Sequence, residues 1–146
     1  MQPVEAFAVH RDRLDRRGDA IDPLVRARLE RARSVSATDY IEIVNERAIL
    51  VRAMDARLAD LDVLALPTTP MVAPLQADLL NAEEFARQNA MLLRNTSMWN
   101  FFDCCAISLP LPRAAALPTG FMLVARNGHD HRLFRMATAV EQLFSA

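Results

Sequence analysis

Three short runs in this chain are apolar along nearly their whole length. They are residues 62–66 (DVLAL), 104–109 (CCAISL) and 121–125 (FMLVA). Each run is too short for a helix, and none shows the regular polar and apolar alternation of a strand with one face in water. We therefore expect three strands, each covered on both faces.

Apolar residues at spacings of three and four predict helices in most of the remaining sequence. We expect them at about 4–16, 22–32, 36–61 and 81–102, with a last one from Asp130. The helix at 36–61 carries an apolar stripe, so we expect it to bury one face. Asp22-Pro23, the capping-box-like Ser36-Ala-Thr-Asp39 and Asn81 are start signals. The predicted fold class is α/β, with a mixed sheet of a few strands and flanking helices.

No repeat, low-complexity tract or linker divides the 146 residues. We therefore expect one domain, helical over 1–61 and ordered strand–helix–strand–strand–helix over 62–146. A sheet made only of central-type strands has no suitable edges, because an edge strand normally carries charges, proline or a bulge. We infer that 1–146 is a single partial domain that belongs to something larger.

The overall charge does not favour nucleic acid or membrane partners. Apolar residues make up 52% of the chain, charged residues 24%, and the net charge is −1. Acidic residues interrupt the arginine-rich N-terminal segment, which favours a solvated, salt-bridged face over a phosphate-binding one. No apolar run approaches the length of a membrane span, and residues 1–18 carry charges where a signal peptide is apolar. We expect a cytoplasmic location.

The composition also excludes several kinds of catalytic and cofactor site. All 17 basic residues are arginine, so this chain contains no lysine base, Schiff-base lysine or phosphate-loop lysine. Glycine occurs only at 18, 120 and 128, which leaves no Gly-rich phosphate loop or dinucleotide fingerprint. No serine has the Gly-x-Ser-x-Gly surroundings of a nucleophile elbow. We assign no catalytic residue and no cofactor.

Zinc is the alternative that the last third of the chain raises. Cys104, Cys105, His129 and His131 are ligand-type residues. Adjacent cysteines and a His-x-His pair do not have the spacing that places two zinc ligands on one side. We predict reduced, buried thiols and no metal site.

A series of short motifs runs through the chain in a fixed order. The motifs are Ser36-Ala37-Thr38-Asp39-Tyr40 with Arg47, Asp62 to Leu64 with Pro67 to Pro70 and Ala73-Pro74, Arg94 with Thr96 and Trp99-Asn100, Ala106 to Pro110, and Leu117 to Gly120 before Asp130. Together they resemble the C-terminal portion of the amidase signature family, which are serine-dependent amide hydrolases. Three positions depart from the family pattern: Ala116 stands where glycine is common before Leu-Pro-x-Gly, and Asp103 and Cys105 stand where glycine and proline are usual. The loops there are expected to have a different shape.

The resemblance implies the C-terminal part of an α/β/α sandwich, in which 62–66 is an interior strand. It also implies that Thr68, Thr69, Trp99 and Asn100 are candidates for the wall of the substrate pocket. Simpler roles stay open: the threonines cap their turn through local hydrogen bonds, and Trp99 belongs to the core.

Family members use a serine nucleophile, a second serine and a lysine base, all located upstream of the matched region. This chain has no lysine, so the resemblance implies scaffold and pocket wall without catalysis. The implied partners are a missing N-terminal catalytic half and, in the complete enzyme, a small amide substrate. The alternative function is a non-catalytic α/β module that self-associates, and we expect a homo-oligomer if the chain is isolated.

Overall fold

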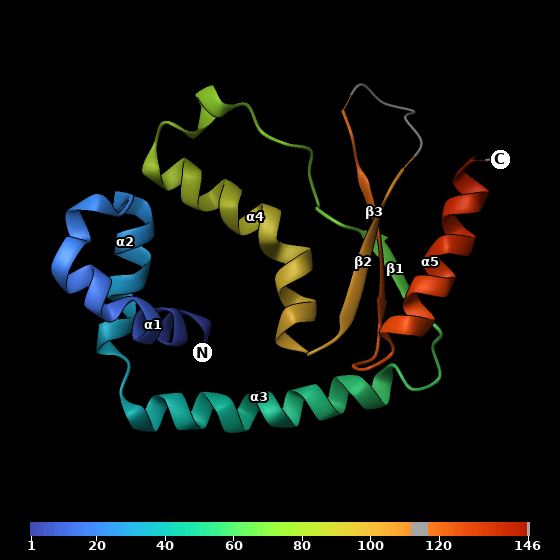
Figure 1. Cartoon of the computed structure of the whole chain (residues 1–146), viewed down its shortest axis with the longest axis horizontal. Helices are drawn as coiled ribbons and strands as arrows, with labels where there is room; N and C mark the ends of the chain where they lie inside the picture. The colour runs from blue at the N-terminus through green and yellow to red at the C-terminus, as the bar shows by residue number, and fades with distance from the viewer. Residues whose placement is uncertain (112–116, 146) are drawn as a thin grey trace. The chain divides into compact units, whose positions relative to one another are not determined.

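The computed structural model describes residues 1–111 and 117–145. The chain divides into two compact units, Met1–Ile49 and Leu50–Ala146. The predicted fold class is confirmed, since a small sheet is flanked by helices (Figure 1). Among the described residues, no helix has the length and apolar character needed to cross a membrane. That 1–146 forms one partial domain stays a prediction.

The first unit is helical. Its elements are α1 (Gln2–Arg17), η1 (Gly18–Ala20), α2 (Pro23–Glu30), η2 (Arg31–Ser34) and the first part of α3 (Ala37–Arg57). Leu14, Leu29 and Ala32 are buried and form its apolar centre.

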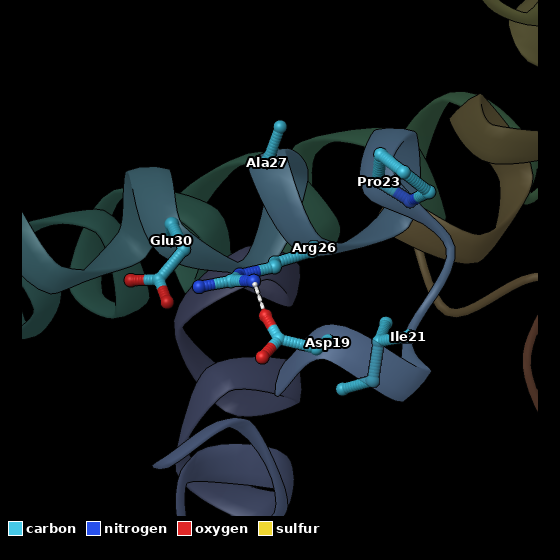
Figure 2. Close-up of a pocket in the computed structure, with 6 residues that line it drawn as sticks. All are labelled: Asp19, Ile21, Pro23, Arg26, Ala27 and Glu30. Atoms are coloured by element: carbon cyan, nitrogen blue, oxygen red, sulfur yellow. Dashed lines mark hydrogen bonds and ion pairs between the residues drawn. The ribbon is translucent and has the colours of Figure 1, made fainter. Parts of the chain in front are cut away.

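Ion pairs surround this centre. Arg26 pairs with Asp19 at 2.8 Å (Figure 2), and Arg33 pairs with Asp15 at 2.7 Å. For Arg26 and Arg33, the salt-bridged interpretation of the arginine-rich segment is confirmed.

The predicted start signals of two helices in this unit are confirmed. Asp22 accepts hydrogen bonds from the backbone N–H groups of Leu24 and Val25, which begins α2. At α3, Ser36 Oγ accepts from the Asp39 N–H at 3.0 Å while Asp39 Oδ2 accepts from the Ser36 N–H at 3.1 Å. Hydrogen bonds to the Asp39 carboxylate from the Ser36 side chain and from the Ser36 N–H lower the pKa of Asp39. The pair is a capping box with aspartate in the place of glutamate.

The buried face predicted for the long helix is wrong over most of its length. Helix α3 ends at Arg57, and none of its residues is buried. On the predicted stripe, Val44 is 37% exposed, whereas Leu58, just past the end of the helix, is 5% exposed. An apolar stripe shows that a helix face can be covered, but it does not show that the covering segment belongs to the same stretch of sequence.

The second unit contains the sheet. Its strands are β1 (Leu64–Pro67), β2 (Cys105–Pro110) and β3 (Gly120–Ala125), in the order β1-β3-β2. Both pairings are antiparallel, so the described sheet is antiparallel and not mixed as predicted. Strand β3 is central, and its residues from Met122 to Ala125 are all buried. Strands β1 and β2 lie at the edges, with alternate residues exposed. The expectation of two covered faces therefore holds for β3 alone.

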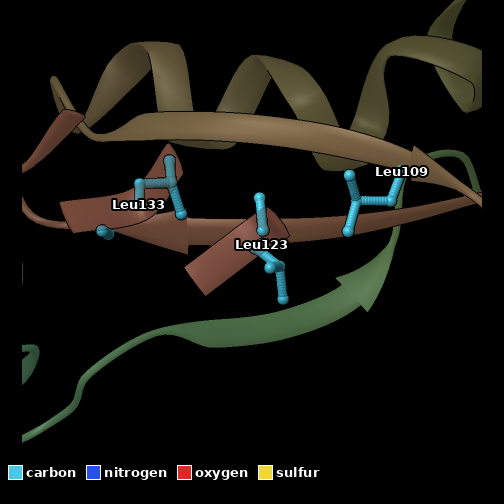
Figure 3. Packing of buried hydrophobic residues seen from close by; sticks show 5 residues of the cluster. Leu109, Leu123 and Leu133 are labelled. Atoms are coloured by element: carbon cyan, nitrogen blue, oxygen red, sulfur yellow. The ribbon is translucent and has the colours of Figure 1, made fainter. Parts of the chain in front are cut away.

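Helices α4 (Ala82–Phe101) and α5 (Asp130–Ser145) lie on opposite faces of the sheet (Figure 1). A short 3-10 helix, η3 (Gln76–Leu79), precedes α4. On the α5 side, Leu109, Leu123 and Ala125 pack with Leu133 and Ala137 of the helix (Figure 3). On the α4 side, Trp99 packs with Met122 and Val124. Each face of β3 therefore has its own apolar cluster.

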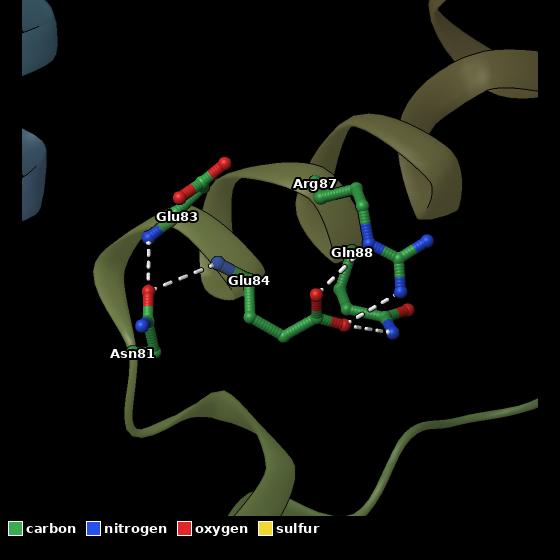
Figure 4. A network of polar contacts seen from close by, with 5 residues as sticks. All are labelled: Asn81, Glu83, Glu84, Arg87 and Gln88. Carbon is green, nitrogen blue, oxygen red and sulfur yellow. Dashed lines mark hydrogen bonds and ion pairs between the residues drawn. The ribbon is translucent and has the colours of Figure 1, made fainter.

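The first turn of α4 forms as the sequence predicts. Asn81 accepts hydrogen bonds from the backbone N–H groups of Glu83 and Glu84, at 2.8 and 3.4 Å (Figure 4). The Glu84 carboxylate also accepts from Arg87 and Gln88, and these hydrogen bonds lower its pKa to about 2.

The loop after α4 has a left-handed residue at its centre. Asp103 has a φ of 56°, in the region that glycine adopts without strain. Aspartate is among the few other residues that enter this region readily. The absence of glycine at 103 therefore does not prevent a glycine-like loop at this position. Ala116, the other position where glycine is common, lies outside the described residues.

Candidate functional site

A small group of residues, one from each strand or the turn next to it, lies together at one end of the sheet. Thr68 follows β1, Ser108 belongs to β2 and Gly120 begins β3. Ser108 pairs directly with Met122, and Gly120 shares the face of Met122 because side chains alternate along a strand. Both therefore lie on the α4 side of the sheet, at the margin of the Trp99 cluster.

Two hydroxyl groups are in direct contact in this group. Thr68 Oγ1 lies 2.5 Å from Ser108 Oγ, which is a hydrogen bond in which either oxygen can be the donor. We call these two side chains the hydroxyl pair. The Thr68 N–H donates to the Gly120 carbonyl at 2.9 Å, which extends the pairing of β1 and β3 by one residue.

The hydroxyl pair requires a glycine beneath it. A Cβ atom at position 120 would lie 2.5 Å from Thr68 Oγ1 and 2.6 Å from Ser108 Oγ. The Thr68 Cβ would lie 2.9 Å away, and it cannot move without its backbone. The absence of a side chain at 120 is thus what allows the two hydroxyls to meet.

Helix α4 is tied to the same end of β1. Asn95 Nδ2 donates to the Pro67 carbonyl at 2.8 Å. This hydrogen bond brings the Asn95 amide to within one residue of Thr68, and it links positions 28 residues apart in sequence.

The four predicted pocket residues do not gather at one point. Thr68 is part of the hydroxyl pair, whereas Thr69 donates locally to the Met71 carbonyl at 2.8 Å. Trp99 is only 4% exposed and packs in the α4-side cluster, and Asn100 is exposed near the end of α4. The indole N–H of Trp99 is buried and has no hydrogen-bond partner within the described part of the chain. A substrate-pocket role for these four residues stays a prediction.

Three residues of this polar group, Ser108, Gly120 and Asn95, were not among the predicted site residues. Ser108 is the one hydroxyl in the apolar run 104–109, and Gly120 is one of three glycines. Both signals were visible in the sequence, but their pairing with Thr68 depends on strand register. Nothing in the sequence distinguishes Asn95 from the other polar residues of α4.

The second unit also has a shallow hollow of about 390 Å³. It is lined by Val51, Arg52, Asp55, Phe102, Cys104, Arg126 and Asn127. Arg126 makes two hydrogen bonds to the Asp55 carboxylate, at 2.7 and 2.6 Å, and these lower the pKa of Asp55. The first unit has a comparable charged hollow around Arg26 (Figure 2).

The two cysteines are free thiols that belong to different clusters, and both are partly buried where the sequence predicted full burial. Cys104 packs with the Trp99 cluster and Cys105 with the Leu123 cluster. Burial raises the pKa of both thiols, which disfavours the thiolate that metal binding and nucleophilic attack require. Within residues 1–111 and 117–145, no three His, Cys, Asp or Glu side chains are grouped as a metal site.

Comparison with known proteins identifies the family. Residues 7–134 match the family described as Amidase. The chain is 36% identical over 129 residues to a 2-amino-5-chloromuconic acid deaminase of Comamonas testosteroni, and the match covers 86% of this chain and 27% of the deaminase.

Solved structures show the same fold. A crystal structure of an amidase superposes with a TM-score of 0.82 at 23% identity, covering 97% of this chain and 33% of the amidase. An allophanate hydrolase of Kluyveromyces lactis superposes with a TM-score of 0.81 at 25% identity, covering 92% of this chain and 22% of the hydrolase. The chain thus spans a third or less of the length of these relatives. The ordered motifs, the family match and the shared fold agree, and the chain belongs to the amidase family.

Proposed function

We propose that this chain is the C-terminal section of an amidase-family enzyme that hydrolyses an amide C–N bond. In this proposal it supplies sheet scaffold and one wall of the substrate pocket, and the catalytic serines and lysine come from the rest of the enzyme. The family match over residues 7–134 carries the proposal, and the separate match to the Comamonas deaminase covers 86% of this chain but only 27% of the deaminase.

The side chains present support a non-catalytic role. A hydroxyl becomes a good nucleophile only when a base takes its proton, and the tetrahedral intermediate needs aimed N–H donors. The chain has no lysine. In the described residues, Ser34 donates to a backbone carbonyl and Ser108 bonds to the Thr68 hydroxyl, so neither of these hydroxyls bonds to a side-chain base, while the Ser36 hydroxyl takes part in the cap of α3.

The pocket wall is proposed from the α4 side of the sheet. Thr68 presents its hydroxyl there, and Trp99 supports the same face from within. Thr69 and Asn100 are proposed as neighbours of the substrate on the adjoining turn and helix end. A small amide is the proposed substrate, since the relatives are named as an amidase, a deaminase and an allophanate hydrolase.

Amide hydrolysis by two proteins tests this proposal. One is the complete protein encoded by the reading frame that contains this sequence, and the other is the 146-residue chain alone. We expect the complete protein to release ammonia or amine from simple aliphatic or aryl amides, and the isolated chain to release none. Turnover by the isolated chain would overturn the non-catalytic role, and no turnover by either protein would overturn the amidase activity.

Self-association is a second candidate function, and exposed apolar surface favours it. Ile41, Ile49 and Leu143 are more than half exposed, and β1 and β2 each have one edge that no described strand covers. Exposed apolar patches and open edges promote association. Light scattering of the isolated chain tests this function: we expect oligomers, and a 16.4 kDa monomer at every concentration would contradict it.

A further inference from the structure

We propose that the turn at Asn127-Gly128 is a modification site, at which the Asn127 side chain loses ammonia and becomes a carboxylate. The turn lies between β3 and α5. The inference goes beyond the proposed function and does not depend on it, because the reaction requires only this chain and water.

The reaction starts at the Gly128 backbone nitrogen. After its proton passes to solvent, this nitrogen attacks the side-chain carbon Cγ of Asn127, and a five-membered ring forms as the bond from Cγ to Nδ2 breaks. The leaving nitrogen takes up a proton and departs as ammonia. Water then adds to either ring carbonyl and opens the ring, which gives aspartate or isoaspartate. Each conversion consumes a water molecule and releases an ammonia molecule, and nothing is oxidised or reduced.

The turn gives the backbone the freedom that ring closure needs. The His129 N–H donates to the Arg126 carbonyl at 3.1 Å, which places Asn127 and Gly128 at the centre of a β-turn. Gly128 has a φ of 77°, and a Cβ at this position would have no atom within 4 Å. The peptide that joins Asn127 to Gly128 therefore borders open space, and glycine restricts its rotation less than any other residue would.

The reacting groups are also free of hydrogen bonds. Asn127 and Gly128 are both exposed. Within residues 1–111 and 117–145, neither the Asn127 amide nor the Gly128 N–H has a hydrogen-bond partner. The nitrogen and the carbon that it attacks belong to adjacent residues, so the reaction needs no encounter between molecules.

The other asparagines of the chain are held by helices. Four of them lie inside helices, where the N–H of the next residue donates to a carbonyl of the same helix. They are Asn45 in α3 and Asn89, Asn95 and Asn100 in α4. The Asn81 side chain accepts from the Glu83 and Glu84 N–H groups as the cap of α4. Asn127 therefore differs from all of them in both its backbone and its side-chain contacts.

The surroundings of Asn127 suit the charged product. Asn127 lines the hollow of about 390 Å³ together with Arg52, Asp55 and Arg126. The two guanidinium groups outnumber the Asp55 carboxylate, so a carboxylate at 127 meets net positive charge. The modification therefore changes the charge of this hollow, and we expect the fold to accommodate it.

Peptide mapping of the complete protein, incubated at neutral pH and body temperature and sampled over time, tests the site. Trypsin cleaves after Arg126 and Arg132, and the peptide 127–132 contains no other asparagine. We expect its mass to rise by the difference between NH2 and OH. The rate should exceed that of every other asparagine of the chain by at least about 10-fold, which corresponds to about 1.4 kcal/mol in activation free energy. A digest at time zero corrects for conversion during digestion.

Two variants separate the effect of the turn from that of the dipeptide. Asn127→Gln lengthens the side chain, so the five-membered ring cannot close and the mass change in this peptide should disappear. Glu46→Gly creates a second Asn-Gly pair at Asn45, an exposed position inside α3. The N–H of residue 46 donates within the helix, so Asn45 should convert more slowly than Asn127 in the same molecule. Glycine inside a helix costs only about 1 kcal/mol, and circular dichroism shows whether the variant folds.

Each outcome supports or overturns the inference. Conversion of Asn127 ahead of all other asparagines in wild type supports it, and that comparison depends on neither variant. Conversion no faster than at the helical asparagines would overturn it, and equal rates at the two Asn-Gly pairs of folded Glu46→Gly would overturn the role of the turn. Asn127→Asp should melt no lower than wild type at neutral pH, and a lower melting temperature would show that the hollow does not accommodate the product. None of these results depends on amide hydrolysis, so the proposed function and this inference can fail separately.

Discussion

The two faces of the sheet differ in what their side chains can do. On the α5 side, Leu109, Leu123 and Leu133 form an apolar cluster. On the α4 side, the cluster around Trp99 gives way to the hydroxyl pair above Gly120. Because side chains alternate along a strand, neighbouring residues of β3 serve these two purposes separately. The comparison indicates that the α5-side cluster packs the sheet with apolar contacts, while the α4 side combines apolar packing with polar contacts.

The largest effect is expected on the α5 side. Leu123 is 2% exposed, so Leu123→Ala leaves a cavity and should lower the free energy of unfolding by about 2–5 kcal/mol. Urea or thermal unfolding of the complete protein measures this. The control is Leu143→Ala, in helix α5. Leu143 is 75% exposed, so this variant should change the free energy of unfolding by less than about 0.5 kcal/mol. Similar losses for both variants would show that α5 does not form a core with β3.

A smaller loss is expected at Gly120, on the α4 side. Gly120→Ala places a Cβ 2.5 Å from Thr68 Oγ1 and should cost about 1–3 kcal/mol, as other overpacked sites do. The same measurement applies. Gly18→Ala is the matched control: its φ is −55° and only the flexible Arg26 side chain is near, so it should be neutral or slightly stabilising. A neutral Gly120→Ala would mean that the hydroxyl pair is not packed against this glycine.

The smallest effect concerns α4 and depends on pH. Arg87 and Gln88 lower the pKa of Glu84 from 4.5 to about 2 (Figure 4), so the folded state favours the ionised carboxylate. Its stabilising contribution is therefore fully present above pH 4.5 and is lost as pH falls toward 2. Glu84→Gln should lower the melting temperature at pH 6 and match wild type near pH 2.

Melting curves at several pH values measure this contribution. The control Glu83→Gln leaves the Arg87 and Gln88 contacts in place and should keep the loss at low pH. A Glu84→Gln difference that is the same at all pH values would contradict the ionic contribution.

Features that depend on residues close in sequence were predictable. Features that depend on contacts between distant segments were not. The caps at Asp22, Ser36 and Asn81 act within three residues, so the sequence around each one contains the whole signal. The three strands were recognised by their apolar runs, but periodicity alone does not tell which strand is central. The exposed face of α3 shows the same limit, since the spacing of its apolar residues says nothing about what covers them.

The candidate site was predicted only in part for the same reason. Thr68 was recognised through the family resemblance, but its partner Ser108 lies 40 residues away in sequence. Their contact follows from the antiparallel register of β2 and β3 and from the missing side chain at Gly120. Neither could be derived without knowing the order of the strands.

In the proposed function, the nucleophile of the amidase lies outside this chain. Labelling of the complete protein with a serine-reactive fluorophosphonate, followed by mass spectrometry of the modified peptide, shows where the nucleophile lies. We predict that the labelled serine lies outside these 146 residues. A label on Ser34, Ser36, Ser97, Ser108 or Ser145 would place the nucleophile in this chain and contradict the account.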